Sequence, residues 1–223
     1  MRLNADLQQR VVIDTSALEW VASPAHGVDR RMLDRIGEEV AVATTIVRYR
    51  PQSGFHSHTH GAGEEILVLQ GSFSDEHGDY PAGTYLRNPP GTSHAPRPEA
   101  GCTIFVKLRQ FTPGDDRQLV VNTLQGRWLD DRSAGVQRLP LHEVDGIDTR
   151  LLRWSPGATW AAQGLGGGLE MLVLEGSLQD AHGRYAAGTW LRYPRGSTAA
   201  FTAGPQGAQA FVKTGHVGAR FVD

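Results

Sequence analysis

The chain has 223 residues, a formal net charge of −2 and a single cysteine, Cys102. A charge this close to zero argues against a nucleic-acid-binding surface, which needs a basic excess. One cysteine allows no intrachain disulfide and excludes the usual cysteine-rich zinc sites. The first residues, "MRLNADLQQR", lack the apolar core of a signal peptide, and no run approaches the roughly 18 apolar residues of a membrane helix. We therefore expect a cytoplasmic protein that binds neither membranes nor nucleic acid.

In chain order, the first half reads mainly as short strands separated by turns. The segment "DRRMLDRIG", residues 29–37, is the one helix candidate. After it, "EVAVATTIVRYR" (39–50) carries β-branched residues at alternate positions, "EEILVLQGSFSD" (64–75) is typical of a buried strand, and "GTYLRNPP" (83–90) of a strand that prolines end. Many short strands at regular spacing predict an all-β fold.

The second half of the chain repeats the first. The stretch from Arg48 to Ala95 aligns without a gap with the stretch from Arg153 to Ala200, and "FVK" at 105–107 returns at 211–213. Similarity at a constant offset indicates a duplicated structural unit. Proline, glycine and charged residues gather at the join, "FTPGDDRQ" (111–118). We predict two tandem antiparallel barrels or sandwiches, one over residues 1–112 and one over 113–223.

Comparison of the two copies separates residues that recur from residues that are replaced. Recurring residues, which we interpret as scaffold, include Glu65 (Glu170), Asp75 (Asp180), Tyr80 (Tyr185) and Arg87 (Arg192). Five residues of the first copy are replaced as a group: His56 by Ala161, His58 by Gln163, His60 by Leu165, Glu64 by Leu169 and His94 by Ala199. Residues that disappear together are expected to act together.

The replaced group has the chemistry of a metal site. Alternate residues of a strand share one face, so His56, His58 and His60 are expected to point inward together. Buried histidines beside a carboxylate are costly unless a cation neutralises them. We predict that His58, His60, Glu64 and His94 bind one divalent metal ion, and that His56 is a pocket wall or a partner of these ligands. Nitrogen-rich ligand sets suit zinc or ferrous iron, with manganese or nickel as alternatives. A hydrogen-bonded polar core is the alternative interpretation.

The same residues resemble the two motifs of the cupin superfamily. "HTHGAGEEILVLQG" supplies the first motif with His58, His60, Glu64 and Gly71, and "GTYLRNPPGTSH" supplies the second with Gly83, Pro89, Gly91 and His94. The resemblance implies a jelly-roll barrel in which the three histidines and the glutamate hold a divalent metal. It also implies that the second copy is a degenerate cupin domain without metal ligands, and it makes a homodimer an expectation.

In finer detail, "FSDEHGDYPAGTYLRNPPGTSHAP" and "GCTIFVKLRQF" resemble the cupin-like domain of ChrR-type anti-sigma factors, which regulate the response to singlet oxygen. In those proteins the domain binds zinc, and a separate N-terminal helical domain binds the sigma factor. Our chain shows no such helical segment, so we do not expect a sigma factor as a partner. The same branch is also similar to acetylacetone-cleaving dioxygenases, which use ferrous iron.

Three functions remain open at this point. The first is a zinc-binding sensor, regulatory or small-molecule-binding protein linked to oxidative stress, whose partner is a small molecule or an oxidant. The second is a mononuclear non-haem iron dioxygenase that acts on a β-diketone-like molecule, and the third is a metal-dependent isomerase. Whether the protein is an enzyme is left open, and no catalytic residue is assigned.

Other conspicuous residues receive structural interpretations. His77 recurs as His182 in a copy without a metal site, so we assign it to a turn. Glu65 should face away from Glu64 and pair with Arg87. Cys102 is expected to be a small buried apolar residue, not a reactive thiol.

Overall fold

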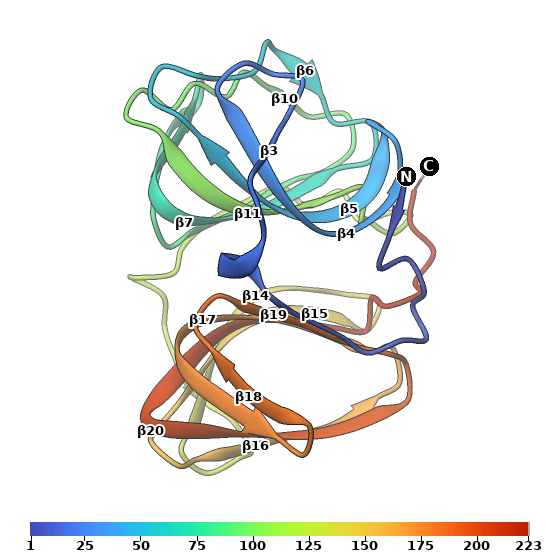
Figure 1. Ribbon diagram of the computed structural model, residues 1–223, viewed down its shortest axis with the longest axis vertical. Helices are drawn as coiled ribbons and strands as arrows, with labels where there is room; N and C mark the ends of the chain where they lie inside the picture. The colour runs from blue at the N-terminus through green and yellow to red at the C-terminus, as the bar shows by residue number, and fades with distance from the viewer. Residues whose placement is uncertain (223) are drawn as a thin grey trace. The chain divides into compact units, whose positions relative to one another are not determined.

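The computed structural model describes residues 1–222, without the side-chain surroundings at positions 163 and 164, and it is built mainly from strands (Figure 1). The elements of the first half are β1 (Arg2–Leu3), β2 (Val11–Asp14), the 3-10 turn η1 (Thr15–Ala17), β3 (Val21–Ala22), β4 (Val28–Gly37), β5 (Ala41–Tyr49), β6 (His58–Thr59), β7 (Glu64–Asp75), β8 (Gly78–Pro81), β9 (Thr84–Asn88), β10 (Ser93–His94) and β11 (Cys102–Leu108). Those of the second half are β12 (Leu119–Asn122), β13 (Leu129–Asp130), β14 (Val136–Val144), β15 (Ile147–Trp154), β16 (Thr159–Leu165), β17 (Leu169–Asp180), β18 (Gly183–Ala186), β19 (Thr189–Tyr193) and β20 (Ser197–Thr214).

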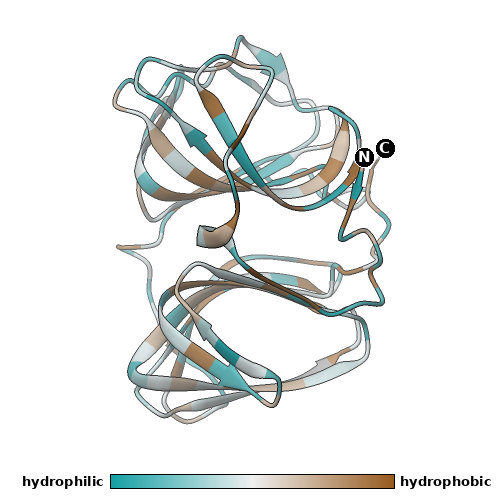
Figure 2. Ribbon diagram, viewed as in Figure 1, coloured by the Kyte–Doolittle hydropathy of each residue, from teal (hydrophilic) through white to brown (hydrophobic). Residues whose placement is uncertain are grey.

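These elements form two compact all-β units, which confirms the predicted fold class. The first unit contains residues 1–5, 18–125 and the C-terminal segment from Arg220, and the second contains Asp6–Ala17 and Gly126–Ala219. Hydrophobic and hydrophilic residues alternate along the strands of each unit (Figure 2). This alternation is the pattern that lets a sheet present an apolar face to the interior of a barrel.

The first unit is a strongly twisted antiparallel sheet with the strand order β1-β4-β5-β11-β7-β9-β12, and β6 and β10 form a separate two-stranded sheet. The central strand β11 pairs with β5 on one side and β7 on the other, so that Ile104 lies opposite Val47 and Val68. β-branched and aromatic side chains from these strands are buried together as one core. Such residues favour strands because they pack well on a pleated surface.

The second unit repeats this topology with the order β13-β14-β15-β20-β17-β19-β2. Its strand β20 runs without interruption over Ser197–Thr214, whereas the matching stretch of the first unit is divided into β10 and β11. The strand β16 is likewise longer than its counterpart β6 and pairs with β20. The first unit is therefore less regular in the two segments that carry the predicted histidines.

The two copies of the sequence exchange one strand each, β2 and β12. The strand β2 belongs to the first copy but pairs with β19, placing Val11 opposite Arg192. The strand β12 belongs to the second copy but pairs with β9, placing Leu119 opposite Arg87 in the equivalent register. The compact units consequently differ from the repeat boundaries at 1–112 and 113–223 by this reciprocal exchange.

The helix predicted at residues 29–37 is wrong, because this segment is the strand β4. It pairs with β5 over its whole length, with a bulge between Met32 and Asp34 that interrupts the two-residue alternation. Two of its polar side chains contact neighbours on the sheet: Arg48 donates a 2.8 Å hydrogen bond to Asp29, and the guanidinium of Arg31 lies 4.2 Å from the ring centroid of Trp20. Tertiary pairing thus overrides a local sequence without strand periodicity.

Candidate metal centre

The short sheet of β6 and β10 positions the predicted histidines. The two strands pair antiparallel with His94 directly opposite His58. His60 follows β6, and two hydrogen bonds fix its backbone. Its N–H donates to the Thr92 carbonyl at 2.8 Å, and its carbonyl accepts from the Gly91 N–H at 2.8 Å. Glu64 is the first residue of β7. Residues far apart in the sequence are thereby brought to one end of the first barrel.

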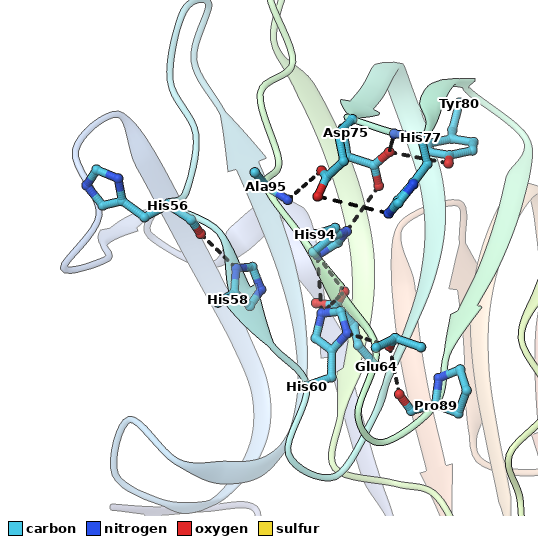
Figure 3. A network of polar contacts seen from close by, with 12 residues as sticks. His56, His58, His60, Glu64, Asp75, His77, Tyr80, Pro89, His94 and Ala95 are labelled. Atoms are coloured by element: carbon cyan, nitrogen blue, oxygen red, sulfur yellow. Dashed lines mark hydrogen bonds and ion pairs between the residues drawn. The ribbon is translucent and has the colours of Figure 1, made fainter.

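Ligand atoms of these residues converge on one point (Figure 3). Each of His58, His60 and His94 offers a nitrogen within 4.8 Å of those of the other two. The Nε2 atoms of His60 and His94 are 3.2 Å apart, and Glu64 Oε2 lies 3.3 Å and 3.4 Å from them, respectively. Donors bound to a single ion at about 2.1 Å are separated by about 3.0–3.4 Å. The cluster therefore has the spacing of a metal site.

Hydrogen bonds to the opposite ring nitrogens fix the tautomers of the three histidines. Nδ1 of His58 lies 3.0 Å from the carbonyl oxygen of His56, and Nδ1 of His94 lies 3.2 Å from Asp75 Oδ2. Both partners accept only, so both Nδ1 atoms must donate. Nδ1 of His60 lies 2.9 Å from Thr92 Oγ1, which already donates its one proton to the Pro89 carbonyl at 2.7 Å.

When the rings are neutral, this arrangement leaves a free lone pair on the Nε2 atom of each of the three histidines. Burial lowers the pKa of His94 and so favours its neutral form. Burial raises the pKa of Glu64, but His60 and the other histidines, in their protonated forms, lower it more, so the net shift favours the ionised carboxylate. Its Oε2 is buried and has no hydrogen-bond donor in the described part of the chain. Four electron-pair donors that face one another without protons fit a cation.

His56 is not part of this cluster. Its side chain is exposed and directed away from the other histidines, so the expectation that it shares their inward face is wrong (Figure 3). The strand β6 contains only His58–Thr59, and the irregular backbone before it breaks the alternation on which that expectation rested. His56 contributes its backbone carbonyl, which orients His58.

Two residues that orient the histidines were not identified from the sequence. Asp75 holds His94, and Thr92 holds His60. Asp75 recurs as Asp180 and was therefore assigned to the scaffold. The available signal for its role was its position at the end of the strand that lies between the two histidine motifs. Partners of this kind fix ring orientation and raise ligand basicity.

The structural interpretations of the remaining residues are confirmed. His77 is exposed in a turn, and its N–H donates to Asp75 Oδ1 at 2.8 Å, as the N–H of His182 donates to Asp180 Oδ1 at 2.8 Å. Glu65 lies 3.5 Å from Arg87 in a buried ion pair. Cys102 is buried, and burial raises the pKa of its thiol to about 12.

A cavity of about 390 Å³ adjoins the cluster inside the first barrel. His58, His60, Glu64 and His94 all line it, together with apolar side chains of β5 and β11 and aromatic side chains of Tyr49 and Phe55. This volume lies in the range of small-molecule sites. The centre is thus accessible to a small ligand from within the barrel.

The matching positions of the second unit hold an apolar core. Leu165 and Leu169 are buried, and Ala199 packs against the same cluster. Ala161 is exposed on β16. Gln163, the counterpart of His58, has its side chain outside the described part of the structure. The described counterparts include no second set of metal ligands.

Two segments that together span most of the chain match one protein-family model. The model described as the ChrR cupin-like domain matches residues 8–112 and again residues 116–218. The chain belongs to the ChrR cupin-like family. Both matches follow the duplication, so this bicupin contains one family domain in each copy. No curated protein sequence matches the chain.

Solved structures share the fold at low sequence identity. A candidate dioxygenase from Nostoc punctiforme has a TM-score of 0.75 and 15% identity, covering 96% of our chain and 85% of its own. A candidate glyoxylate-induced protein from Pseudomonas aeruginosa has a TM-score of 0.76 and 15% identity, with coverages of 96% and 90%. A variant of Bacillus subtilis oxalate decarboxylase has a TM-score of 0.66 and 13% identity, with coverages of 91% and 76%. These likenesses establish the bicupin fold.

The described residues include no helix with the length and apolar character needed to cross a membrane.

Proposed function

We propose that the first barrel holds one divalent metal ion through His58, His60, Glu64 and His94 and binds a small molecule beside it. The single observation that carries this proposal is the convergence of three Nε2 lone pairs and a buried carboxylate oxygen at the end of a cavity. A metal ion bound there would act as a Lewis acid and provide a coordination point for a ligand. The residues of the chain orient the ligand set and surround the small molecule with apolar walls.

Within this function, we favour a zinc-binding sensor or regulatory protein linked to the oxidative stress response, since the ChrR cupin-like domain matches both copies. The buried Cys102, with its raised pKa, is a poor candidate for the oxidisable group. The metal centre itself would therefore have to respond to the oxidant or ligand. A sigma factor is not part of the proposal.

A second candidate is a mononuclear iron dioxygenase, which the cavity favours. The space of about 390 Å³ beside the ligands would accommodate a small organic substrate such as a β-diketone. The similar candidate dioxygenase from Nostoc punctiforme supports this alternative at the level of the fold. In that case the barrel would orient the substrate and keep water away from it.

Metal analysis and oxygen consumption test the proposal and separate the two candidates. Protein purified without oxygen is analysed for its metals, and His94→Ala is compared with His182→Ala, which removes an exposed histidine of the second unit. We expect His94→Ala to lose the metal and His182→Ala to keep it. Equal metal content in both variants would contradict the metal site. Iron-dependent oxygen uptake with β-diketones, lost in His94→Ala, would establish the dioxygenase, whereas zinc retained without turnover would support the sensor.

A further inference from the structure

Three arginines line the cavity that adjoins the candidate metal centre. Arg30 and Arg35 come from β4, and Arg109 follows β11. Apart from Glu64, which belongs to the ligand set, Glu39 is the one acidic residue of this lining. Arg35 is buried, and Arg30 and Arg109 are half-buried. Charges withdrawn from water in this way are costly unless anions compensate them. The charges of these arginines therefore indicate what the cavity receives.

Arg35 and Arg30 have partial compensation from the protein. Arg35 is 4% exposed and donates to the carbonyl oxygens of Glu38 and Glu39. Arg30 lies 3.3 Å from the carboxylate of Glu39, whose side chain is 67% exposed, and the Nε of Arg30 is buried without a hydrogen-bond partner. An ion pair this exposed contributes little and can be exchanged for a ligand.

Arg109 is the most informative of the three. Its backbone has φ of 59°, in the left-handed region that disfavours residues with a side chain. Its N–H donates to the Gly63 carbonyl at 2.9 Å, which holds the backbone in this conformation. Its Nη1 lies 3.4 Å from the position that a Cβ on Gly61 would occupy, next to the ligand His60. In the described part of the chain, its guanidinium has neither a hydrogen bond nor an ion pair with a protein group.

The second unit makes the same turn with glycine. Gly215 occupies the matching position, has φ of 89°, and its N–H donates to the Gly168 carbonyl at 3.1 Å. The turn itself thus requires no arginine. The first unit carries a strained arginine at this point, beside the histidine cluster, and strained residues gather at functional sites.

The charged residues at the matching positions of the second unit differ from those of the first, because their positive and negative charges are balanced. Arg138 and Glu143 occupy the positions of Arg30 and Arg35, and the counterpart of Thr45 is Arg150. Arg150 lies 3.2 Å from Asp148. Two acidic residues therefore accompany two arginines in the unit without a metal site, whereas the cavity of the first unit has a cationic excess.

We propose that the cavity of the first unit recognises a small organic acid, whose carboxylate pairs with Arg109 and Arg30 and whose apolar body lies along the β5 and β11 side chains. The inference rests on the proposed function in that the same cavity opens onto the metal centre. Arginine suits this role because its planar donors match the two oxygens of a carboxylate. The apolar side chains of Val47, Ile104 and Val106 supply the walls for the hydrocarbon part.

The test compares an acid with its uncharged amide. Valerate and valeramide are titrated by calorimetry into the zinc-loaded full-length chain and into the metal-free chain. We expect valerate to bind about tenfold more tightly than valeramide, because a charge-assisted hydrogen bond is stronger than a neutral one. Arg109→Gln and Arg109→Gly should each raise the Kd of valerate about tenfold and leave that of valeramide unchanged. Arg109→Gly keeps the variant foldable, since the second unit has glycine there.

Arg138→Gln, in the second unit, is the matched control for Arg30→Gln. Only Arg30→Gln should weaken valerate binding. Equal affinities for acid and amide, an unchanged Kd in both Arg109 variants, or no measurable binding of linear, branched or aromatic carboxylates would overturn the inference. Metal content is measured on the same samples, so the two proposals fail separately. A chain that takes up no zinc on loading but still prefers valerate through Arg109 would refute the metal site and support the anion site. A metal-loaded chain without that preference would do the reverse.

Discussion

Asp75 and Asp180 occupy the same point of equivalent strands in the two barrels. Each accepts a hydrogen bond from the equivalent tyrosine hydroxyl, Tyr80 at 3.4 Å for Asp75 and Tyr185 for Asp180, but the second side-chain partner differs. Asp75 accepts a hydrogen bond from Nδ1 of His94 at 3.2 Å. Asp180 accepts one from the Tyr185 hydroxyl at 2.5 Å and another from Tyr193. The scaffold supplies a carboxylate at this point in both barrels, buried for Asp75 and half-buried for Asp180. The identity of the neighbouring side chain decides whether this carboxylate orients a metal ligand or closes a structural network.

The same contrast extends to the interior of each barrel. The first unit directs polar groups at a common point, and the second packs leucine and alanine there. An apolar core needs no partner to be stable, whereas converging lone pairs do. The comparison indicates that the first barrel keeps a costly site that the fold itself does not require. The four predictions that follow test this difference.

The largest effect is expected when the first barrel receives the residues of the second. The combined variant His60→Leu, Glu64→Leu and His94→Ala should lose all bound metal and remain folded. Its metal-free form should melt above the metal-free wild type, because apolar side chains replace a buried carboxylate and imidazoles that lack a cation. Elemental analysis and thermal circular dichroism check both expectations. Retained metal, or a lower melting temperature than that of the metal-free wild type, would contradict the comparison.

The reverse substitution in the second barrel should be strongly destabilising. Leu169 is fully buried, and Leu169→Glu places a carboxylate among apolar neighbours without the histidines that accompany Glu64. We expect the free energy of unfolding to fall by about 3 kcal/mol or more, measured by urea denaturation. Leu169→Met is the matched control and should cost less than about 1.5 kcal/mol. If both variants are equally stable, this position tolerates charge and the second core is not apolar in the sense argued above.

A smaller effect is expected from Asp75→Asn. This change keeps the shape of the side chain but weakens the bond that orients His94, so the affinity for metal should fall about 10–100-fold. Competition with a chromophoric chelator measures the change. Asp180→Asn in the second barrel should leave metal affinity unaltered, because its partners are tyrosines. A loss of affinity in Asp180→Asn alone would show that orientation by Asp75 is not the operative contact.

The duplication and the motif spacing made the fold and the four candidate ligands predictable from sequence. The replacement of His60, Glu64 and His94 as a group marked them as one unit, and the geometry brings them together with His58. The predicted ligands agree with the cluster in the structure because the motif spacing reflects the local turns that place these residues. No long-range information was needed for His58 and His60, and the second motif supplied His94.

The features that escaped prediction depend on pairing between distant segments. The helix expected at 29–37 became β4 because β5 supplies partners along its length. The exchange of β2 and β12 has no local signal, since either strand would fit either barrel by sequence alone. Arg109 looked ordinary until its left-handed backbone and its place beside Gly61 were known. Each of these depends on backbone geometry, which a single sequence does not encode locally.

The smallest effect concerns a pair of residues at the start of β4 and β14. Asp29 accepts a hydrogen bond from Arg48 at 2.8 Å, whereas its counterpart Gln137 accepts one from Arg153 at 2.6 Å. The hydrogen bond from Arg48, reinforced by Arg50, lowers the pKa of Asp29 below its ordinary value near 3.8 in spite of burial. Because the folded pKa is lower, the ionised carboxylate contributes stability above that ordinary value, and this contribution disappears as the pH falls through the folded pKa.

Asp29→Asn should therefore destabilise the protein by about 1 kcal/mol at neutral pH, since both arginines are partly exposed and the pair is screened. The difference from the wild type should shrink progressively below about pH 4, as Asp29 of the wild type becomes protonated. Gln137→Asn, a neutral-to-neutral change at the matching position, should give a difference that does not vary with pH. Urea denaturation across the acidic range measures both. A pH-independent effect of Asp29→Asn would mean that shape, not charge, distinguishes the two barrels at this position.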